Sequence, residues 1–141
     1  MAVKVFFAVK APAEAAKARA PLARAAALGL GARNSAREVN LILTDGPGIK
    51  KLNRSFLGKN RLTDVIAFNF PPSPVPGAAW GEIYVCLPVA ARQARRMGHS
   101  LLTELLVLAA HGALHLAGME DNTPALRRRM NGRTAALLKK I

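Results

Sequence analysis

The segment that decides the fold runs from Leu101 to Asp121, LLTELLVLAAHGALHLAGMED, and holds the longest apolar stretch of the chain. Ser100 is a good helix N-cap, and Thr103 and Glu104 suit a first helical turn. Gly118 can adopt the left-handed backbone conformation that ends a helix and turns the chain back. The sequence therefore predicts a helix from position 101 to this glycine, with the acidic residues after it brought back towards the helix end.

Two histidines stand four residues apart in this predicted helix. Residues with this spacing lie one above the other on the same helical face, so His111 and His115 can reach one metal ion. The turn at Gly118 can bring Glu120 or Asp121 beside them, which gives two neutral nitrogens, a carboxylate and an open position for water. Such ligands suit zinc first, with iron, nickel or manganese as alternatives. The competing interpretation is a histidine pair satisfied within the core or at the surface.

The composition predicts one globular domain over residues 1–141. Hydrophobic residues make up 51% of the chain, which suffices for a core of its own. The single cysteine, Cys86, excludes an internal disulfide and suits a reducing compartment. The N-terminus lacks a secretory layout, and the apolar run is shorter than the roughly 20 residues that span a bilayer. We expect a cytoplasmic protein without a membrane span, favoured as a monomer.

The charge balance indicates a polyanionic partner. Lysine and arginine total 21 against eight acidic residues, which gives a formal net charge of +13. Such an excess attracts nucleic acid, and binding of this kind weakens as salt is added. The alternative is an arginine-rich surface with no particular partner, since charge alone names no substrate.

The remaining pattern predicts an α+β fold, with a central four-stranded mixed sheet packed by helices on one side and a cleft between sheet and histidine helix. Strands are expected at residues 3–9, 37–44, 63–70 and 82–86, and helices at 13–30, 49–56, 88–97, 101–118 and 124–140. Pro21 should divide the first helix, Pro47 suits the first turn of the second, and Thr123 is the expected N-cap of the last.

The histidine spacing also compares with the zinc-protease signature H-E-x-x-H-x-x-G-x-x-H. This chain keeps both helical histidines and the glycine, but Gly112 stands where the protease has its glutamate general base. Without that carboxylate the usual proton acceptor for peptide hydrolysis is missing. The sequence therefore argues against a metallopeptidase, which is the least favoured hypothesis for the function of this chain.

The segment HGALHLAGMED (111–121) resembles the signature H-G-x-L-H-L-x-G-Y-D-H of the YbeY family, bacterial rRNA maturation factors regarded as metal-dependent single-strand endoribonucleases. Three further blocks are similar to that family and follow in its order. They are LNRSFLGKNRLTDVIAFNFP (52–71), WGEIYVC (80–86) and GHSLLTELLVLAAHG (98–112). The resemblance implies a zinc-dependent hydrolase that trims ribosomal RNA near the 3′ end of the small subunit and takes part in ribosome quality control. Its implied partners are single-stranded rRNA and the small ribosomal subunit.

The site expected from residues and resemblance together has three parts. The metal ligands are His111, His115 and Asp121. The candidate catalytic carboxylates are Glu104, which stands seven residues before His111 on the same face and could orient a ligand imidazole, and Glu120. A plain helix-dipole role is the alternative for Glu104. The candidate RNA-binding residues are Arg54, Lys59 and Arg61, which precede the strand that begins near position 63.

Two departures from the family bear on activity. The third histidine of the family falls on Asp121, whose carboxylate adds negative charge and weakens the Lewis acidity of a bound metal. An arginine of the family, which engages phosphate, falls on Leu57, so Arg54, Lys59 or Arg61 would have to supply the cation. These departures favour the second hypothesis, a ribosome-assembly factor that binds RNA with weak catalysis.

Overall fold

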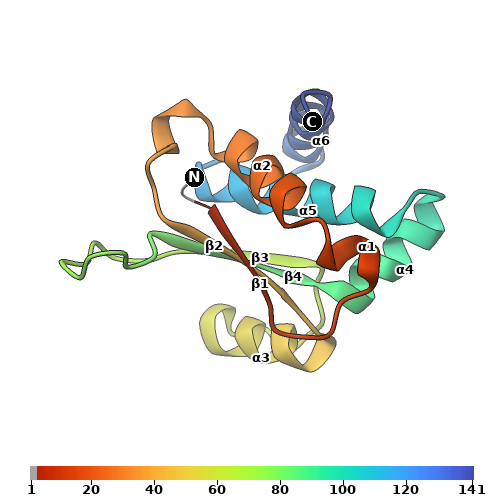
Figure 1. Cartoon of the computed structure of the whole chain (residues 1–141), viewed down its shortest axis with the longest axis horizontal. Helices are drawn as coiled ribbons and strands as arrows, with labels where there is room; N and C mark the ends of the chain where they lie inside the picture. Colours follow the sequence, from red (N-terminus) through yellow and green to blue (C-terminus); the bar gives the residue numbers. More distant parts are fainter. Residues whose placement is uncertain (1–2) are drawn as a thin grey trace.

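The computed structural model describes residues 3–141 and contains a four-stranded mixed sheet at its centre (Figure 1). The strands are β1 (Val3–Phe7), β2 (Val39–Thr44), β3 (Val65–Asn69) and β4 (Gly81–Cys86). Their order is β1-β2-β4-β3, with β1, β2 and β4 parallel and β3 antiparallel to β4. The predicted α+β class and mixed four-stranded sheet are confirmed.

The helices follow the predicted order with small shifts at their ends. They are α1 (Ala13–Ala16), α2 (Arg19–Leu30), α3 (Gly46–Leu57), α4 (Leu87–Met97), α5 (Leu101–Leu116) and α6 (Pro124–Leu138), with a short 3-10 turn η1 (Ala32–Asn34). The first predicted helix is divided, as expected, so that Pro21 falls in the first turn of α2 and not in a helix interior. No single helix within residues 3–141 is long and apolar enough to cross a membrane. Only α4 and α5 taken together reach that length and apolarity, and this pair is bent by 116°.

Side-chain caps set where three helices begin. The Ser100 hydroxyl accepts a hydrogen bond from the Thr103 amide at 3.1 Å, and Thr123 does the same for Leu126 at 3.1 Å, so both predicted caps are present. The carboxylate of Asp45 accepts from the Gly48 amide at 2.8 Å. This third cap starts α3 three residues earlier than the sequence predicted.

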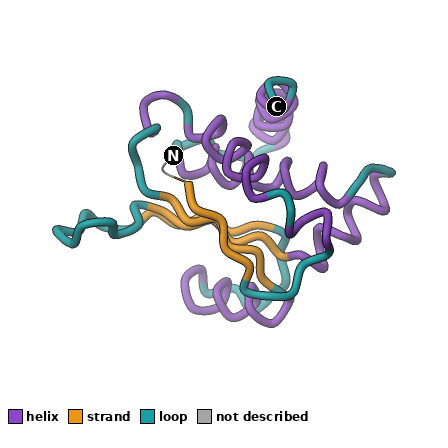
Figure 2. Tube along the Cα trace, in the orientation of Figure 1, coloured by secondary structure: helices purple, strands orange, loops and turns teal. Residues whose placement is uncertain are grey.

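The expectation that helices cover one side of the sheet is wrong. α2 and α5 cover one face with α6 outside them, whereas α3 lies across the opposite face (Figures 1 and 2). The reason is a second apolar cluster, in which Ile49 of α3 packs with Ile66 and Cys86 of the sheet and with Val89. Cys86 is therefore a buried free thiol within this cluster, as its single occurrence suggested.

The central helix α5 lies unusually close to the sheet. Its Leu105 and Ala109 are fully buried, and a Cβ atom built on Gly112 would lie 2.4 Å from Cγ2 of Ile83 and 3.3 Å from Cγ2 of Val65. Position 112 therefore faces the core, and a glutamate general base has no room there. This packing gives a physical reason for the argument against a metallopeptidase.

We predict that Gly112→Ala lowers the free energy of unfolding by about 1–3 kcal/mol, because the added methyl group overpacks a filled core. Gly132→Ala is the matched control. Gly132 is exposed within α6, and apart from its chain neighbours and the adjoining backbone of α6 no heavy atom of the described residues would lie within 4 Å of its Cβ. This control should be stabilising by about 0.5–1 kcal/mol from helix propensity alone. Urea denaturation of the two variants measures both changes, and equal stability would contradict the close approach of α5.

Candidate active site

The chain turns back at the end of α5 as the sequence predicted. Gly118 has a φ of 101°, and its amide donates to the His115 carbonyl at 3.0 Å. The Met119 amide donates to the Leu114 carbonyl at 2.9 Å, which completes the turn. This turn brings Oδ2 of Asp121 to 3.4 Å from Nε2 of His115. Two of the three predicted metal ligands are thereby in contact.

The hydrogen bonding of His115 fixes which ring nitrogen faces Asp121. Its Nδ1 lies 3.1 Å from the carbonyl oxygen of Met119, which can only accept, so Nδ1 carries a proton. In the neutral ring Nε2 then has a free lone pair directed at a carboxylate oxygen. Two such acceptors repel each other unless a proton or a metal ion satisfies them. A backbone carbonyl that orients the far nitrogen of an imidazole is a common support for a metal ligand.

The third candidate ligand, His111, is half-buried. Burial lowers the pKa of its imidazole, a shift that the Asp64 carboxylate opposes and the neighbouring His115 reinforces. The ring is therefore neutral near pH 7, which is the form that binds metals. Its Nε2 is buried without a hydrogen-bond partner among the described residues. Such an orphaned nitrogen needs a partner that residues 3–141 do not supply.

The three donors do not converge on one point. Among residues 3–141, no three His, Cys, Asp or Glu side chains are grouped closely enough to hold a metal ion. His115 lines a cleft of about 260 Å³, whereas His111 lines a neighbouring cavity of about 740 Å³. The donor types and the orphaned Nε2 of His111 nevertheless fit zinc, which takes two imidazoles and a carboxylate with a fourth position open.

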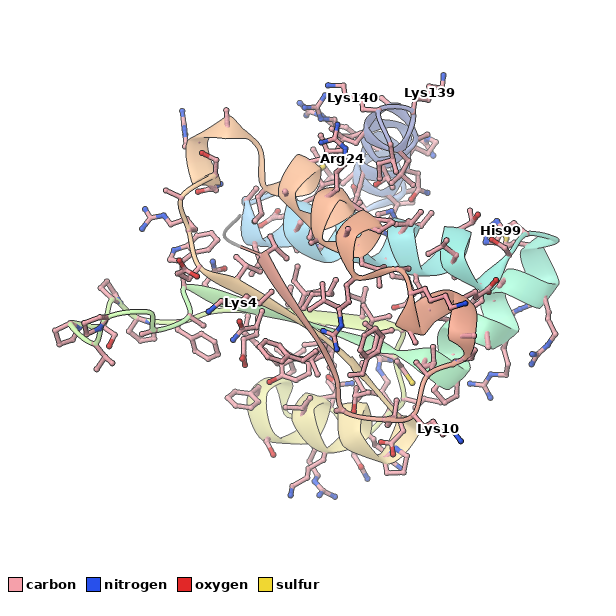
Figure 3. The ribbon with its side chains drawn as sticks, viewed as in Figure 1. Lys4, Lys10, Arg24, His99, Lys139 and Lys140 are labelled. Carbon is pink, nitrogen blue, oxygen red and sulfur yellow. The ribbon has the colours of Figure 1, made fainter. Side chains whose placement is uncertain are left out.

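The two candidate catalytic carboxylates lie apart from this contact. Glu104 is buried, and its Oε1 lies 2.7 Å from Nε2 of His99, a residue in the turn between α4 and α5 (Figure 3). It therefore supports His99, although it lines the same cavity as His111. Glu120 lines a separate cavity of about 430 Å³ beside Gly118. Their catalytic roles stay predictions.

Sequence reasoning did not single out His99 as the partner of Glu104. The available signal was that His99 stands just before the Ser100 cap. The first turn of α5 brings Glu104, the fourth residue after the cap, back beside this histidine. A histidine just before the N-cap and an acidic residue in the first helical turn thus predict a contact between the two side chains.

The cleft that contains His115 brings this one predicted metal ligand together with two of the predicted RNA-binding residues. Lys59 and Arg61 line it, together with Leu57 and residues of β3. Arg54 is exposed on α3 but is not part of this lining. The loop is held by buried Asn53, whose Nδ2 donates to the Arg61 carbonyl at 3.0 Å. Asn53 is the second residue whose role the sequence did not reveal.

Basic residues also lie far from the cleft. Figure 3 shows Lys139, Lys140 and Arg24 together at the C-terminal end of α6, on the opposite side of the sheet from α3. The guanidinium of Arg24 donates to the Lys140 carbonyl at 3.2 Å. The net positive charge is therefore spread over the molecule, and the cleft holds only part of it.

Comparison with known proteins agrees with this geometry. A family model described as Endoribonuclease YbeY matches residues 9–141. An Endoribonuclease YbeY of Elusimicrobium minutum is 43% identical, with each chain covered completely, and one of Moorella thermoacetica is 42% identical over 72% of this chain and 70% of its own. The solution structure of a Thermotoga maritima protein superposes with a TM-score of 0.62 at 28% identity, over 98% of this chain and 90% of that one. The resemblance of the sequence motifs is confirmed, and the chain belongs to the YbeY endoribonuclease family.

Proposed function

We propose that this protein hydrolyses single-stranded ribosomal RNA in the cleft between β3, the α3–β3 loop and the end of α5. The observation that carries the proposal is that Lys59, Arg61 and His115 line one cleft. Phosphate-binding cations and a candidate metal ligand thus meet at the same place, in a member of an endoribonuclease family.

Each group has a distinct task in this proposal. His111, His115 and Asp121 would hold zinc, which when bound supplies a water of lowered pKa and a Lewis acid. The Met119 carbonyl keeps the proton of His115 on Nδ1, so that Nε2 stays free to bind. Lys59 and Arg61 would bind phosphate oxygens on either side of the scissile bond and stabilise the charge that develops there. Glu120 and Glu104 remain the carboxylates available for proton transfer and for support of the histidines.

The size of the cleft favours an unpaired substrate. A volume of about 260 Å³ is too small for a duplex, whose strands would have to be opened at a cost before a nucleotide could enter. Following the family, the substrate we propose is rRNA near the 3′ end of the small subunit, with a role in ribosome quality control. The proposed setting is the cytoplasm, with the protein acting as a monomer on or beside the small ribosomal subunit.

Two residues of the site favour a second function, RNA binding with slow cleavage. Leu57, which is 51% exposed, lines the cleft at the position where the family resemblance places an arginine. Asp121 replaces the third imidazole of the expected metal site. A protein with fewer cations and a weaker Lewis acid would bind rRNA during ribosome assembly and cleave it slowly.

We predict that the full-length protein binds zinc and that His115→Ala lowers the affinity at least about tenfold, since it removes a ligand whose second nitrogen is already oriented. Competition with a chromogenic chelator measures the affinity. His99→Gln is the matched control, because the Nε2 of that histidine is engaged with Glu104. If both variants bind zinc like the parent protein, His115 is not a ligand.

We predict that Leu57→Arg raises the rate of RNA cleavage several-fold, because it adds a cation to the cleft wall close to the reacting phosphate. The control is Leu62→Arg, which adds the same charge to the same loop at a position that is 43% exposed and outside the cleft lining. The assay is hydrolysis of a single-stranded rRNA fragment with and without a chelator. Equal rates for the two variants would mean that the added charge, and not its place, is responsible.

RNA affinity should depend on salt through the two cleft cations. For single strands, the logarithm of the binding constant changes with the logarithm of salt concentration by about −0.7 per phosphate contact. Replacing both Lys59 and Arg61 with alanine should therefore make this slope shallower by about 1.4. Replacing Lys139 and Lys140, which lie at the far end of α6, should leave the slope closer to that of the parent protein (Figure 3). A larger effect from the α6 pair would move the RNA-binding surface away from the cleft.

A further inference from the structure

Phe56, at the end of α3, carries an aromatic ring that is largely in solvent. It is 60% exposed, and the next residue in the chain, Leu57, is 51% exposed. Large apolar side chains gathered at a surface usually mark a binding site. We call these two residues the loop patch.

The Phe56 ring is supported from one side. Its centroid lies 4.7 Å from that of Phe68 on β3, with 44° between the ring planes. Phe68 in turn packs edge-on against Tyr84 at 6.2 Å and joins the cluster formed by Ile66 and Cys86. The exposed ring is therefore held in position by the sheet and does not depend on a ligand for its place.

This aromatic pair adjoins the cleft. Leu57, the residue after Phe56, and Ile66, which lies on the same face of β3 as Phe68, both line the cleft that contains His115. Lys59 and Arg61 of the same lining are exposed in the same loop. An exposed aromatic ring thus lies beside the cations that would hold a phosphate backbone.

A polar group near the ring also lacks a partner. Asn53 stands one helical turn before Phe56 and lines the cleft, and its Oδ1 is buried without a hydrogen-bond partner among the described residues. An unsatisfied acceptor of this kind suits a ligand with hydroxyl or N–H donors. RNA has such donors on its ribose and on its bases.

We propose that Phe56 is the stacking platform for an unpaired nucleobase of the RNA whose phosphates occupy the cleft. This inference rests on the proposed function and adds to it the group that selects single strands. A base can lie on an aromatic ring only after leaving its own helical stack, so the platform favours loops and unpaired ends over duplexes. The flanking cations favour RNA over an apolar protein segment as the occupant.

The test is equilibrium binding of the full chain to a short single-stranded RNA, with a chelator present to stop cleavage. The RNA carries a fluorescent adenine analogue whose emission is quenched on stacking. Phe56→Leu keeps an apolar side chain but removes the π-face, and should weaken binding about tenfold and abolish the quenching, since stacking on an aromatic side chain contributes about 1–3 kcal/mol per base. Phe56→Trp should retain both affinity and quenching.

Phe6→Leu is the matched control, because Phe6 is 47% exposed on β1, the opposite edge strand of the sheet. It should bind RNA like the parent protein. If Phe56→Leu also binds and quenches like the parent, the platform is wrong while RNA binding in the cleft stands; an apolar protein contact at the loop patch would give this result. If the parent protein does not bind the RNA at all, the proposed function fails and the platform fails with it.

Discussion

The close contact between α5 and the sheet at Gly112 determines where everything else in the candidate site can lie. Because position 112 carries no side chain, the helix backbone approaches Ile83 and Val65 directly. This contact fixes the rotation of α5 about its own axis. His111 is then half-buried with its Nε2 enclosed, while His115, one turn further on, reaches the cleft at the edge strand β3. A bulkier residue at position 112 would displace both histidines together.

The electrostatics at the end of α5 follow from the same turn that ends the helix. Gly118 sends the chain back so that one backbone carbonyl and one carboxylate approach the two nitrogens of His115 from opposite sides. The carbonyl fixes the proton on Nδ1, and the carboxylate faces Nε2. A site of this kind is prepared for a positive charge by local chain geometry, with five residues between the imidazole and its acidic neighbour.

Much of this arrangement could be predicted from the sequence because it depends on local chemistry. The caps at Ser100 and Thr123, the glycine turn at 118 and the contact of Asp121 with His115 all involve residues close together in the chain. The position of α3 on the second face of the sheet could not be predicted in this way, because it depends on long-range packing of Ile49 against Ile66 and Cys86. The same applies to Glu104: helical periodicity places it on the face of His111, but a histidine from the preceding turn is nearer. Asn53 was missed because its bond to the Arg61 carbonyl spans a loop whose shape the sequence does not specify.

The placement of β3 has a consequence for the motions of the cleft. Within the described part of the chain this strand is hydrogen-bonded to β4 alone, and a loop rich in proline and projecting from the body of the molecule follows it (Figure 1). Strands joined on one side open locally at a lower free energy than central strands do. The backbone amides of this cleft wall, like those of the other edge strand β1, should thus exchange with solvent more readily than those of β2 and β4, which are paired on both sides and keep α5 and its histidines in place. Local opening of this sheet edge would admit and release a strand of RNA without unfolding the rest of the protein.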